Sequence, residues 1–519
     1  LMTDPDQTIK AGLNDNRRRF LDWTLIAVFV VMVSAPMLTT PWARQLEAGG
    51  EERELAPWPP RPRDTQAILA YPRRVEAWVQ DHFGLRDALV RAHSRLCYHV
   101  LGTSASSKVL LGRDAWLFYH GDRLDGRPIE DYRGSQPLSA RQLEWIRWML
   151  QDQYEWLRDH RTDYLFVLIP SKEDVYDEYL PSCVTRVGPL NTRQQVVEYM
   201  QARTQVPVLD VSAAMEAART NRLCFRKTDT HWTDYGAFVA YREIMSRLAR
   251  KFPGAEPFPE SAFNYRRGTE DGGDLAAMLN MCEDLREEVE HMAPVDPARG
   301  RPHEAAKELA DLFAGTGDAA SPTAVVYRDS YSEILIPFLS EHFRQVRYVW
   351  ARLGANMDGV AAAPPDIVLQ IMSDRALRLN LRYSPEIQQY CVRRRFADST
   401  LRLSGSEQLA PLGDTAASHE NEALLLSSLS GAPEAELPAI GDTDKVLPIV
   451  RIDVTLDEDD EVALSVGGET VTRQRPGKGR RELILALYDP GQSGAVRFRF
   501  GSRPGRVRLH ALEIRGWPR

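Results

Sequence analysis

Short apolar runs alternate with longer amphipathic segments through the middle of the chain, between residues 139 and 371. Apolar runs bounded by turn-forming residues are typical of strands buried on both faces. They predict five strands, at 163–169, 206–211, 323–327, 347–350 and 366–371.

The amphipathic segments carry the signals of helix starts. Ser139 and Gln142 match a capping box that opens a tryptophan-rich helix running to about His160. Thr233 is placed to cap the next long helix, and the strand at 323–327 leads into a helix expected over 332–343. Strands separated by helices imply a mostly parallel sheet covered on both faces. We therefore predict an α/β domain over residues 100–395.

A different pattern follows this domain. Residues 396–420 are rich in serine, glycine, alanine and acidic residues and are expected to form a linker. From 421 to 519 only short strands separated by Gly, Pro and Asp turns are expected, at 450–456, 461–466, 481–488, 495–500 and 506–514. This spacing is typical of a small all-β sandwich.

The N-terminal part contains an uncharged segment, residues 23–40, that follows three consecutive arginines. Its length approaches the roughly 20 residues of a helix that crosses a bilayer. We predict a cytoplasmic tail at 1–20 and a transmembrane anchor at 21–42, oriented by the arginines. A cleaved signal peptide is the alternative, because Val33-Ser34-Ala35 resembles a cleavage site, although Pro36 would then begin the mature chain.

Both alternatives place the rest of the chain outside the cytoplasm. Residues 43–99 are expected to begin with a proline-rich extended stalk at 51–63 and to continue as an amphipathic segment. Disulfides can form in such a compartment, and Cys183 with Cys224 is the expected pair.

Composition narrows the possible partners. The formal charge of −8 is spread over 519 residues, and no run of basic residues is interleaved with aromatics, so nucleic acid is not expected. The five cysteines show no CxxC spacing, and histidines such as His303 and His342 lack ligand spacing. We predict neither a metal site nor a bound cofactor.

One candidate for chemistry is the segment Asp229-Thr230-His231-Trp232. In an extended strand, residues two apart project from the same face, so Asp229 and His231 would be neighbours. A carboxylate beside an imidazole holds its tautomer and stabilises the imidazolium formed during proton transfer. The alternative is a surface loop in which this spacing is a coincidence.

A second candidate is Ser330, which follows an apolar strand and opens a predicted helix. A helix N-terminus offers free backbone N–H groups and partial positive charge, which suit a nucleophile and an oxyanion site. The structural alternative is capping, because Asp and Ser are frequent N-caps. Ser332 is the more plausible cap of the two serines.

Together these segments resemble the alginate O-acetyltransferase group, whose catalytic domain is similar to SGNH hydrolases. The resemblance extends over about residues 50–375, in motifs that occur in the family's order: ERELAPWP (52–59), DHFGLRDAL (81–89), VLLGRDAWLFY (109–119), IPSKEDVYDEYLP (169–181), DTHWTDYGAFVAY (229–241), GGDLAAML (272–279) and RDSYS (328–332). It implies a three-layer α/β fold of the SGNH type and polysaccharide O-acetylation. At the matching positions it implies Ser330 as nucleophile and His231 with Asp229 as its partners.

Two positions depart from the family pattern. Arg328 stands where SGNH hydrolases have glycine before the Asp-Ser pair, and its guanidinium either binds substrate or, as we favour, covers the edge of the sheet. Ala115 stands where the family often has glycine, and only a local backbone difference is expected.

Four residues are candidates for contact with the substrate. Besides Arg328, Lys172 either contacts an anionic sugar or is solvated, the latter being favoured, and Tyr331 either lines the pocket or packs in the core. Trp232 is interpreted as packing behind the histidine rather than as a sugar platform. Gly272-Gly273-Asp274 either contributes backbone N–H groups to the site or, as we favour, forms a structural turn.

The resemblance implies transfer of acetyl groups to hydroxyls of an exported polysaccharide through an acetyl-serine intermediate. It also implies an acetyl donor relayed by a membrane-bound O-acyltransferase, a catalytic domain in the periplasm of a bacterium, an anchor in the inner membrane and a C-terminal carbohydrate-binding domain. A polysaccharide acetyl esterase and a non-catalytic polysaccharide-binding assembly protein remain alternatives.

Overall fold

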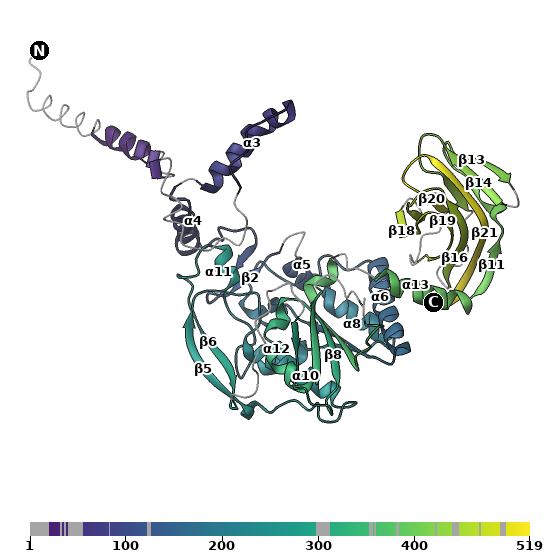
Figure 1. The fold of residues 1–519 in the computed structure, drawn as a ribbon. Coiled ribbons are helices and arrows are strands. Elements are labelled where there is room, and N and C mark those ends of the chain that lie inside the picture. The colour runs from purple at the N-terminus through teal and green to yellow at the C-terminus, as the bar shows by residue number, and fades with distance from the viewer. Residues whose placement is uncertain are drawn as a thin grey trace, which may run out of the picture. The chain divides into compact units, whose positions relative to one another are not determined.

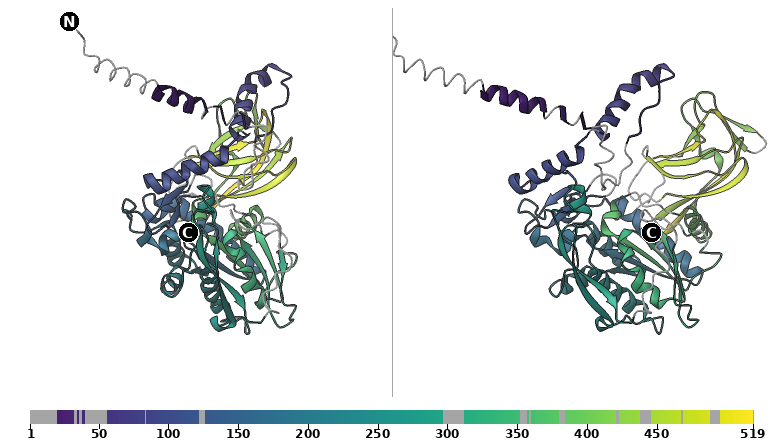
Figure 2. Two further views of the ribbon diagram at one scale, coloured as in Figure 1. Left: turned by 90° about the vertical axis from the view of Figure 1, so that its left-hand side faces the viewer. Right: turned by 60° about the vertical axis from the view of Figure 1, so that its left-hand side comes forward.

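The computed structural model contains two compact units, residues 1–119 with 227–230 and 269–288, and residues 120–226 with 231–268 and 289–519. The residues that it describes are 20–31, 34–35, 38–39, 56–82, 84–121, 126–296, 312–351, 357, 360–379, 384–420, 423–437, 446–466, 469–487 and 495–518. Figures 1 and 2 show the ribbon from three directions.

The first unit combines helices with a β-hairpin. Its elements are α3 (Thr65–His82), α4 (Arg86–Arg95), the π-helical segment η2 (Leu96–Leu101), β1 (Val109–Leu111), β2 (Leu117–Tyr119) and α11 (Asp274–Met278). Apolar side chains of the hairpin pack with those of α11 and the turn after it: Val109, Leu117, Tyr119, Leu275, Ala276, Leu279, Met281 and Leu285. The amphipathic segment predicted after the stalk is divided between α3 and α4.

The turn between β1 and β2 has an unusual backbone. Asp114 and Ala115 both have positive φ, 52° and 63°, and Trp116 N donates to Arg113 O at 3.0 Å. Two central residues with positive φ are typical of the type I′ hairpin turn, in which glycine is favoured at the second of them. The expected local difference at Ala115 is therefore an alanine in a left-handed conformation.

Replacing Ala115 with glycine is expected to stabilise the protein by about 0.5–1 kcal/mol, because the β-carbon is strained at this φ. Thermal unfolding at several denaturant concentrations would measure the gain. Ala88→Gly, in the interior of α4, is the matched control and should destabilise instead. A loss of stability in Ala115→Gly would contradict the strain argument.

The second unit is built on a six-stranded sheet with the order β4-β3-β10-β8-β9-β7. The strands are β3 (Asp163–Ile169), β4 (Val208–Asp210), β7 (Leu312–Ala314), β8 (Thr323–Arg328), β9 (Gln345–Trp350) and β10 (Ile367–Ser373). All neighbours are parallel except β7 and β9. The five predicted strands and the mostly parallel sheet are confirmed.

Helices lie on both sides of this sheet, with α10 (Asp234–Leu248) and α12 (Ile336–Leu339) on one side and α6 (Ala140–Asp159) and α8 (Thr192–Arg203) on the other (Figure 1). The remaining helical elements are α5 (Pro128–Arg133), α7 (Lys172–Val175), η3 (Asp177–Tyr179), α9 (Ser212–Ala218), η4 (Glu260–Ala262), η5 (Ser330–Glu333), η6 (Ser340–His342), η7 (Asp374–Arg378) and α13 (Pro385–Ala397). Strands β5 (Phe263–Glu270) and β6 (Glu287–Pro294) form a separate two-stranded sheet.

The predicted helix starts have mixed outcomes. The capping box of Ser139 and Gln142 is present, and the Thr233 side chain accepts the amide of Gly236. The single helix expected over 332–343 is wrong, because this segment is divided into η5, α12 and η6. Pro337 lacks an N–H donor and sits in the first turn of α12, so the helix has to restart there.

The C-terminal strands form two sheets around their own core. One has the order β13-β14-β21-β16-β19, with β11 also paired to β21, and the other has the order β12-β15-β20-β17-β18. The strands are β11 (Thr400–Ser404), β12 (Ala410–Pro411), β13 (Ala416–Glu420), β14 (Ala423–Ser428), β15 (Glu434–Leu437), β16 (Val446–Leu456), β17 (Val462–Val466), β18 (Glu469–Gln474), β19 (Gly479–Ala486), β20 (Val496–Phe500) and β21 (Gly505–Pro518). This agrees with the expected all-β architecture.

The linker expected at 396–420 is wrong. Its residues include β11, η8 (Ser406–Gln408), β12 and β13, and these strands pair with β21, β15 and β14. Small polar residues are tolerated here because β13 is exposed along its whole length and gains its order from pairing with β14.

The predicted anchor at 21–42 lies only partly within the described residues. Residues 20–31 are helical. In the described part of the chain, no helix combines the length and the apolar character needed to cross a membrane.

The expected disulfide between Cys183 and Cys224 is wrong, because all five cysteines are free thiols. The Cys224 side chain is buried beside the carbonyl of Met215, whereas Cys183 is exposed. Burial also raises the pKa of the Cys224 thiol to about 12, which keeps it protonated and unreactive.

Candidate active site

Ser330 lies in a turn that Asp329 holds at the carboxyl end of the sheet. Asp329 is buried, and its carboxylate accepts the amide of Tyr331 at 3.1 Å and the amide of Ser373, at the end of β10, at 2.8 Å. The residue that caps η5 is therefore Asp329 and not Ser332. Through this carboxylate the ends of β8 and β10 fix the position of the serine.

The structure brings His231 and Ser330 together across 99 positions of sequence. Nε2 of His231 and Oγ of Ser330 are 2.9 Å apart, which is within hydrogen-bond distance. The next residue of each segment makes a second link, because Nε1 of Trp232 donates to the carbonyl of Tyr331 at 2.9 Å. Two adjacent hydrogen bonds thus join the two segments, one between side chains and one that restrains the backbone.

The segment that carries His231 is fixed to the body of the second unit. Phe225 and Trp232 form an isolated antiparallel bridge, and Thr233 N donates to Cys224 O at 2.9 Å. Nζ of Lys172 donates to the carbonyl of Arg226 at 3.1 Å. The histidine is therefore presented by a closed turn between residues 225 and 232.

Asp229 belongs to the first unit, where it accepts the backbone N–H of Asp274 at 3.2 Å. Gly273, the residue before Asp274, lies directly against it: a β-carbon there would be 2.5 Å from Cβ of Asp229 and 2.6 Å from its Cγ. The next residue, Thr230, donates its amide to Asp274 Oδ1 at 2.7 Å. Only glycine at position 273 leaves room for the Asp229 carboxyl in this place.

The glycine turn is built by hydrogen bonds within the first unit, as expected of a structural turn, and its Asp274 N–H also contacts Asp229. Gly272 N donates to the carbonyl of Cys282 at 2.8 Å, and Gly273 N donates to Oγ1 of Thr228 at 2.9 Å. Oγ1 of Thr228 in turn donates to the carboxylate of Glu287 at 2.5 Å. These bonds hold the short segment 227–230 in the first unit.

The four candidates for substrate contact are all buried. Lys172, Arg328 and Tyr331 are each 2% exposed, and Trp232 is 0% exposed. The expectation that Lys172 is solvated is wrong, because its ammonium group is used to hold the carbonyl of Arg226. Packing is confirmed for Trp232.

The side chains of Arg328 and Tyr331 make packing contacts inside the protein. The Arg328 guanidinium lies 5.3 Å from the ring centre of Trp350, its cross-strand partner on β9, and 3.6 Å from the Glu333 carboxylate. The Tyr331 ring packs 5.0 Å from the His231 ring and 5.6 Å from that of Trp232, and burial raises the pKa of its phenol well above the usual value. Neither residue presents its side chain at the surface.

An acidic network that the sequence analysis did not predict follows β3 and β10. Ser171 donates both its amide and its hydroxyl to Asp374, at 3.0 and 2.5 Å. Arg193 forms ion pairs with Asp174, Asp210 and Asp374. Burial, followed by the charge of Asp174, raises the pKa of Asp374. This network crosslinks the loops beside the serine turn and carries no exposed nucleophile.

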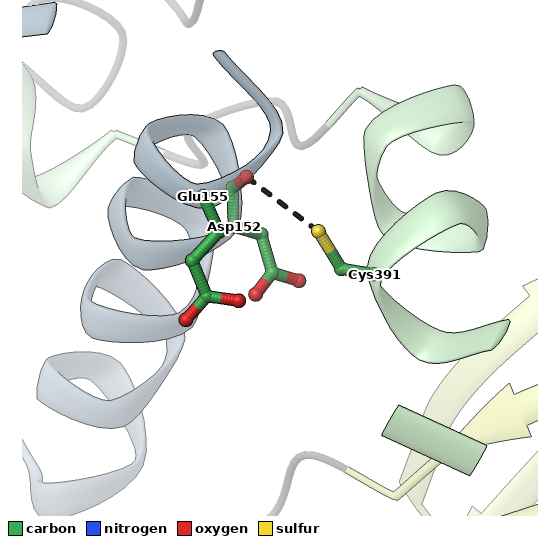
Figure 3. Close-up of side chains that lie close together, drawn as sticks. All are labelled: Asp152, Glu155 and Cys391. Carbon is green, nitrogen blue, oxygen red and sulfur yellow. Dashed lines mark hydrogen bonds between the residues drawn. The ribbon is translucent and has the colours of Figure 1, made fainter. Parts of the chain in front are cut away.

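Asp152, Glu155 and Cys391 also lie close together, with ligand atoms within 4.8 Å of one another (Figure 3). Both carboxylates already share one cationic partner, because Nη2 of Arg395 binds each of them. Burial raises the pKa of the Cys391 thiol, and Sγ donates to the carbonyl of Asp152 at 3.6 Å. We interpret this group as a structural contact between α6 and α13.

This contact predicts a pH dependence of stability. Burial outweighs the attraction of Arg395 and raises the pKa of Asp152 from 3.8 to about 6. The folded state therefore binds this proton more tightly than the unfolded state, and the stability it contributes is lost as the pH rises from about 4 to about 6. Asp152→Asn has no carboxyl group to ionise. Its free energy of unfolding should therefore be spared up to about 3 kcal/mol of the decrease that the wild type undergoes over this pH range.

Denaturant unfolding of wild type and Asp152→Asn between pH 4 and 7 would measure the effect as the difference between the two stability curves. Glu198→Gln, at an exposed position on α8, is the matched control and should follow the wild-type curve. A constant difference between Asp152→Asn and wild type across this pH range would contradict the prediction.

The sequence of the central part of the chain matches one family of proteins. Residues 109–362 match the sequence profile of the family described as SGNH hydrolase-like domain, acetyltransferase AlgX. This part of the chain is therefore similar to the SGNH hydrolase-like domain of that acetyltransferase family.

Curated relatives have names that agree with this family. The chain is 31% identical over 144 residues to the probable alginate O-acetylase AlgJ of Pseudomonas putida, covering 28% of this chain and 34% of the relative. It is 24% identical over 261 residues to the protein of that name from Pseudomonas fluorescens, covering 49% of this chain and 61% of the relative. The chain thus spans between about a third and three fifths of these relatives' own lengths.

Solved structures are also similar to part of the chain. The O-acetyltransferase domain of Pseudomonas putida AlgJ has 23% identity and a TM-score of 0.38, covering 54% of this chain and 97% of that one. Bacillus cereus PatB1 has 16% identity and a TM-score of 0.41, covering 53% of this chain and 99% of that one.

Proposed function

We propose that this protein is an O-acetyltransferase that transfers acetyl groups to hydroxyls of an exported polysaccharide through an acetyl-serine intermediate. The observation that carries the proposal is the distance of 2.9 Å between Nε2 of His231 and Oγ of Ser330. A serine hydroxyl at this distance from an imidazole can pass its proton to the ring as it attacks a carbonyl carbon.

In the first step, Oγ of Ser330 attacks the acetyl carbonyl of the donor and Nε2 of His231 takes the hydroxyl proton. The bond between the acetyl group and the donor breaks, and the departing group receives that proton. In the second step, His231 takes the proton of a sugar hydroxyl as its oxygen attacks the acetyl-serine. The acetylated sugar leaves, and the proton returns to Oγ of Ser330.

Asp229 is proposed as the carboxylate that orients the imidazole and stabilises its cationic form. Two observations support this role. Asp229 is only two residues from His231 in the sequence, and its carboxyl is held by the backbone of Asp274.

The proposal includes the cellular setting. The names of the curated relatives, probable alginate O-acetylase, support a polysaccharide acceptor. We propose that the catalytic domain lies in the periplasm, that residues 21–42 anchor it in the inner membrane, and that a membrane-bound O-acyltransferase relays the acetyl group. The C-terminal sandwich is proposed to hold the polymer.

The test uses purified full-length protein, a chromogenic acetyl ester as donor and a uronate oligosaccharide as acceptor. Wild type should produce acetylated oligosaccharide, detected by mass, and Ser330→Ala should not. Acetate release without a sugar product would instead identify an esterase. Equal, negligible turnover by both proteins would favour a polysaccharide-binding protein without catalysis.

A further inference from the structure

The first unit presents an apolar helix face that no described part of the chain covers. Leu85, at the start of α4, Leu89 on α4, and Leu96 and Val100 on η2 are separated by four, seven and four positions and therefore share one helix face. They are 38%, 48%, 50% and 71% exposed. We call these four residues the α4 stripe.

The opposite side of the same helices is fixed to the unit. Ser94 and Cys97 are buried, and Tyr98 packs against the apolar core that contains β1, β2 and α11. Arg91 and Arg95 form ion pairs with Glu283 and Asp284 at 3.3 and 2.8 Å. The α4 stripe is thus held facing outward by contacts on the other side of the helices.

A second exposed apolar element precedes Thr39, which lies against the start of this stripe. Residues 20–31 are helical, and their large apolar side chains are exposed on every side of the helix: Phe20, Leu21, Trp23, Leu25, Ile26, Val28, Phe29, Val30 and Val31. Thr39, a few residues beyond, lies against Gly84 so closely that a β-carbon on Gly84 would collide with it. Gly84 directly precedes Leu85.

Whatever covers the α4 stripe must also be compatible with the apolar helix at residues 20–31. A helix that is apolar around its whole circumference is stable in hydrocarbon, whereas a protein partner normally covers one face. An amphipathic helix with aliphatic residues along one side lies in the interface of a bilayer, with that side in contact with the acyl chains. The arginines of α4 are already paired with acidic residues, so the stripe depends on apolar contact rather than on lipid charge.

We propose that the α4 stripe lies in the surface of a lipid bilayer and holds the first unit against the membrane. The bilayer surface would begin where Thr39 meets Gly84 and would extend along α4 and η2, whose 16 residues are about 24 Å long. This inference does not rest on acetyl transfer.

The test places a fluorescent probe on the stripe of the full-length chain. Val100→Cys is labelled with a thiol-reactive fluorophore in a background that contains Cys183→Ser and Cys282→Ser, which removes the thiols that are not buried. The protein is reconstituted in phosphatidylcholine vesicles with or without a lipid that carries a doxyl quencher near the headgroup. We expect the doxyl lipid to quench the label, and Leu89→Glu with Leu96→Glu to weaken this quenching by about threefold or more.

The matched control is Leu401→Glu with Leu429→Glu, which adds the same charges at leucines that are 57% and 95% exposed in the sandwich. This control should leave the quenching unchanged. A label that the doxyl lipid does not quench, or one that is quenched equally in the stripe variant, would overturn the proposal. Blue-shifted emission without lipid quenching would also overturn it and would point to a protein occupant.

Discussion

Ser330→Ala should lower kcat for acetyl transfer by about 10³-fold or more while leaving the fold intact. The Ser330 hydroxyl lies within hydrogen-bond distance of His231, and in its proposed role as nucleophile its loss removes the covalent step that the histidine assists. The side chain is only partly buried, so its removal leaves no sizeable cavity. Steady-state transfer rates and the mass of the protein after incubation with donor would measure both consequences.

Ser332→Ala is the matched control for this prediction. Ser332 lies two residues further in the same turn, is 0% exposed, and its Oγ has no hydrogen-bond partner in the described structure. Removing an unsatisfied buried hydroxyl should leave activity unchanged and alter stability by no more than about 1 kcal/mol. An acetylated Ser330→Ala protein, or transfer at the wild-type rate, would show that another residue is the nucleophile.

Gly273→Ala should lower kcat by about 10²- to 10⁴-fold, although the residue has no side chain to contribute to chemistry. Its new methyl group would overlap the carboxyl of Asp229, so the carboxyl must move. In the role proposed for Asp229, a misplaced carboxylate no longer holds the imidazole tautomer, and loss of that function in a serine–histidine–aspartate site costs about 10⁴-fold. Transfer kinetics well below the unfolding temperature would separate this effect from lost stability.

The neighbouring glycine provides the control. A β-carbon on Gly272 would be 2.5 Å from Cβ of Ala276 and 2.8 Å from the carbonyl of Leu285, so its three nearest neighbours belong to these two residues and not to Asp229. Gly272→Ala should therefore destabilise the turn while retaining most of the activity of the folded protein. Combining Gly273→Ala with Asp229→Asn should give little further loss, because both changes remove the same function. Additive losses would contradict this account.

The elements around the serine could be predicted from local sequence, because their determinants are local. The apolar run at 323–327, followed by the Asp-Ser turn, became β8 and η5, and the capping residues Ser139 and Thr233 begin the helices expected of them. The motif at residues 229–232 identified His231 as a candidate for proton transfer. Its hydrogen bond to Ser330, however, joins residues 99 positions apart. Only the resemblance to a family linked these two segments before the structure did.

The errors arose where distant segments decide the environment of a residue. Lys172 stands in a polar stretch that favours exposure, yet it is buried, and its ammonium group donates a hydrogen bond to the carbonyl of Arg226, 54 positions away. Asp329 could be recognised as an N-cap type, but its second bond to Ser373 depends on the neighbouring position of β8 and β10. Residues 400–420 become strands only because β21, β14 and β15 offer them partners.

The position of β21 in its sheet has a consequence for the order in which the chain can fold. This strand pairs with β11, β14 and β16, all of which precede it in sequence. During synthesis, β14 and β16 emerge with the place between them still vacant, and their sheet closes only when residues 505–518 have left the ribosome. The sandwich therefore completes its assembly only after these residues are translated, and not strand by strand during synthesis. Until then β14 and β16 expose unpaired edges that a chaperone could recognise.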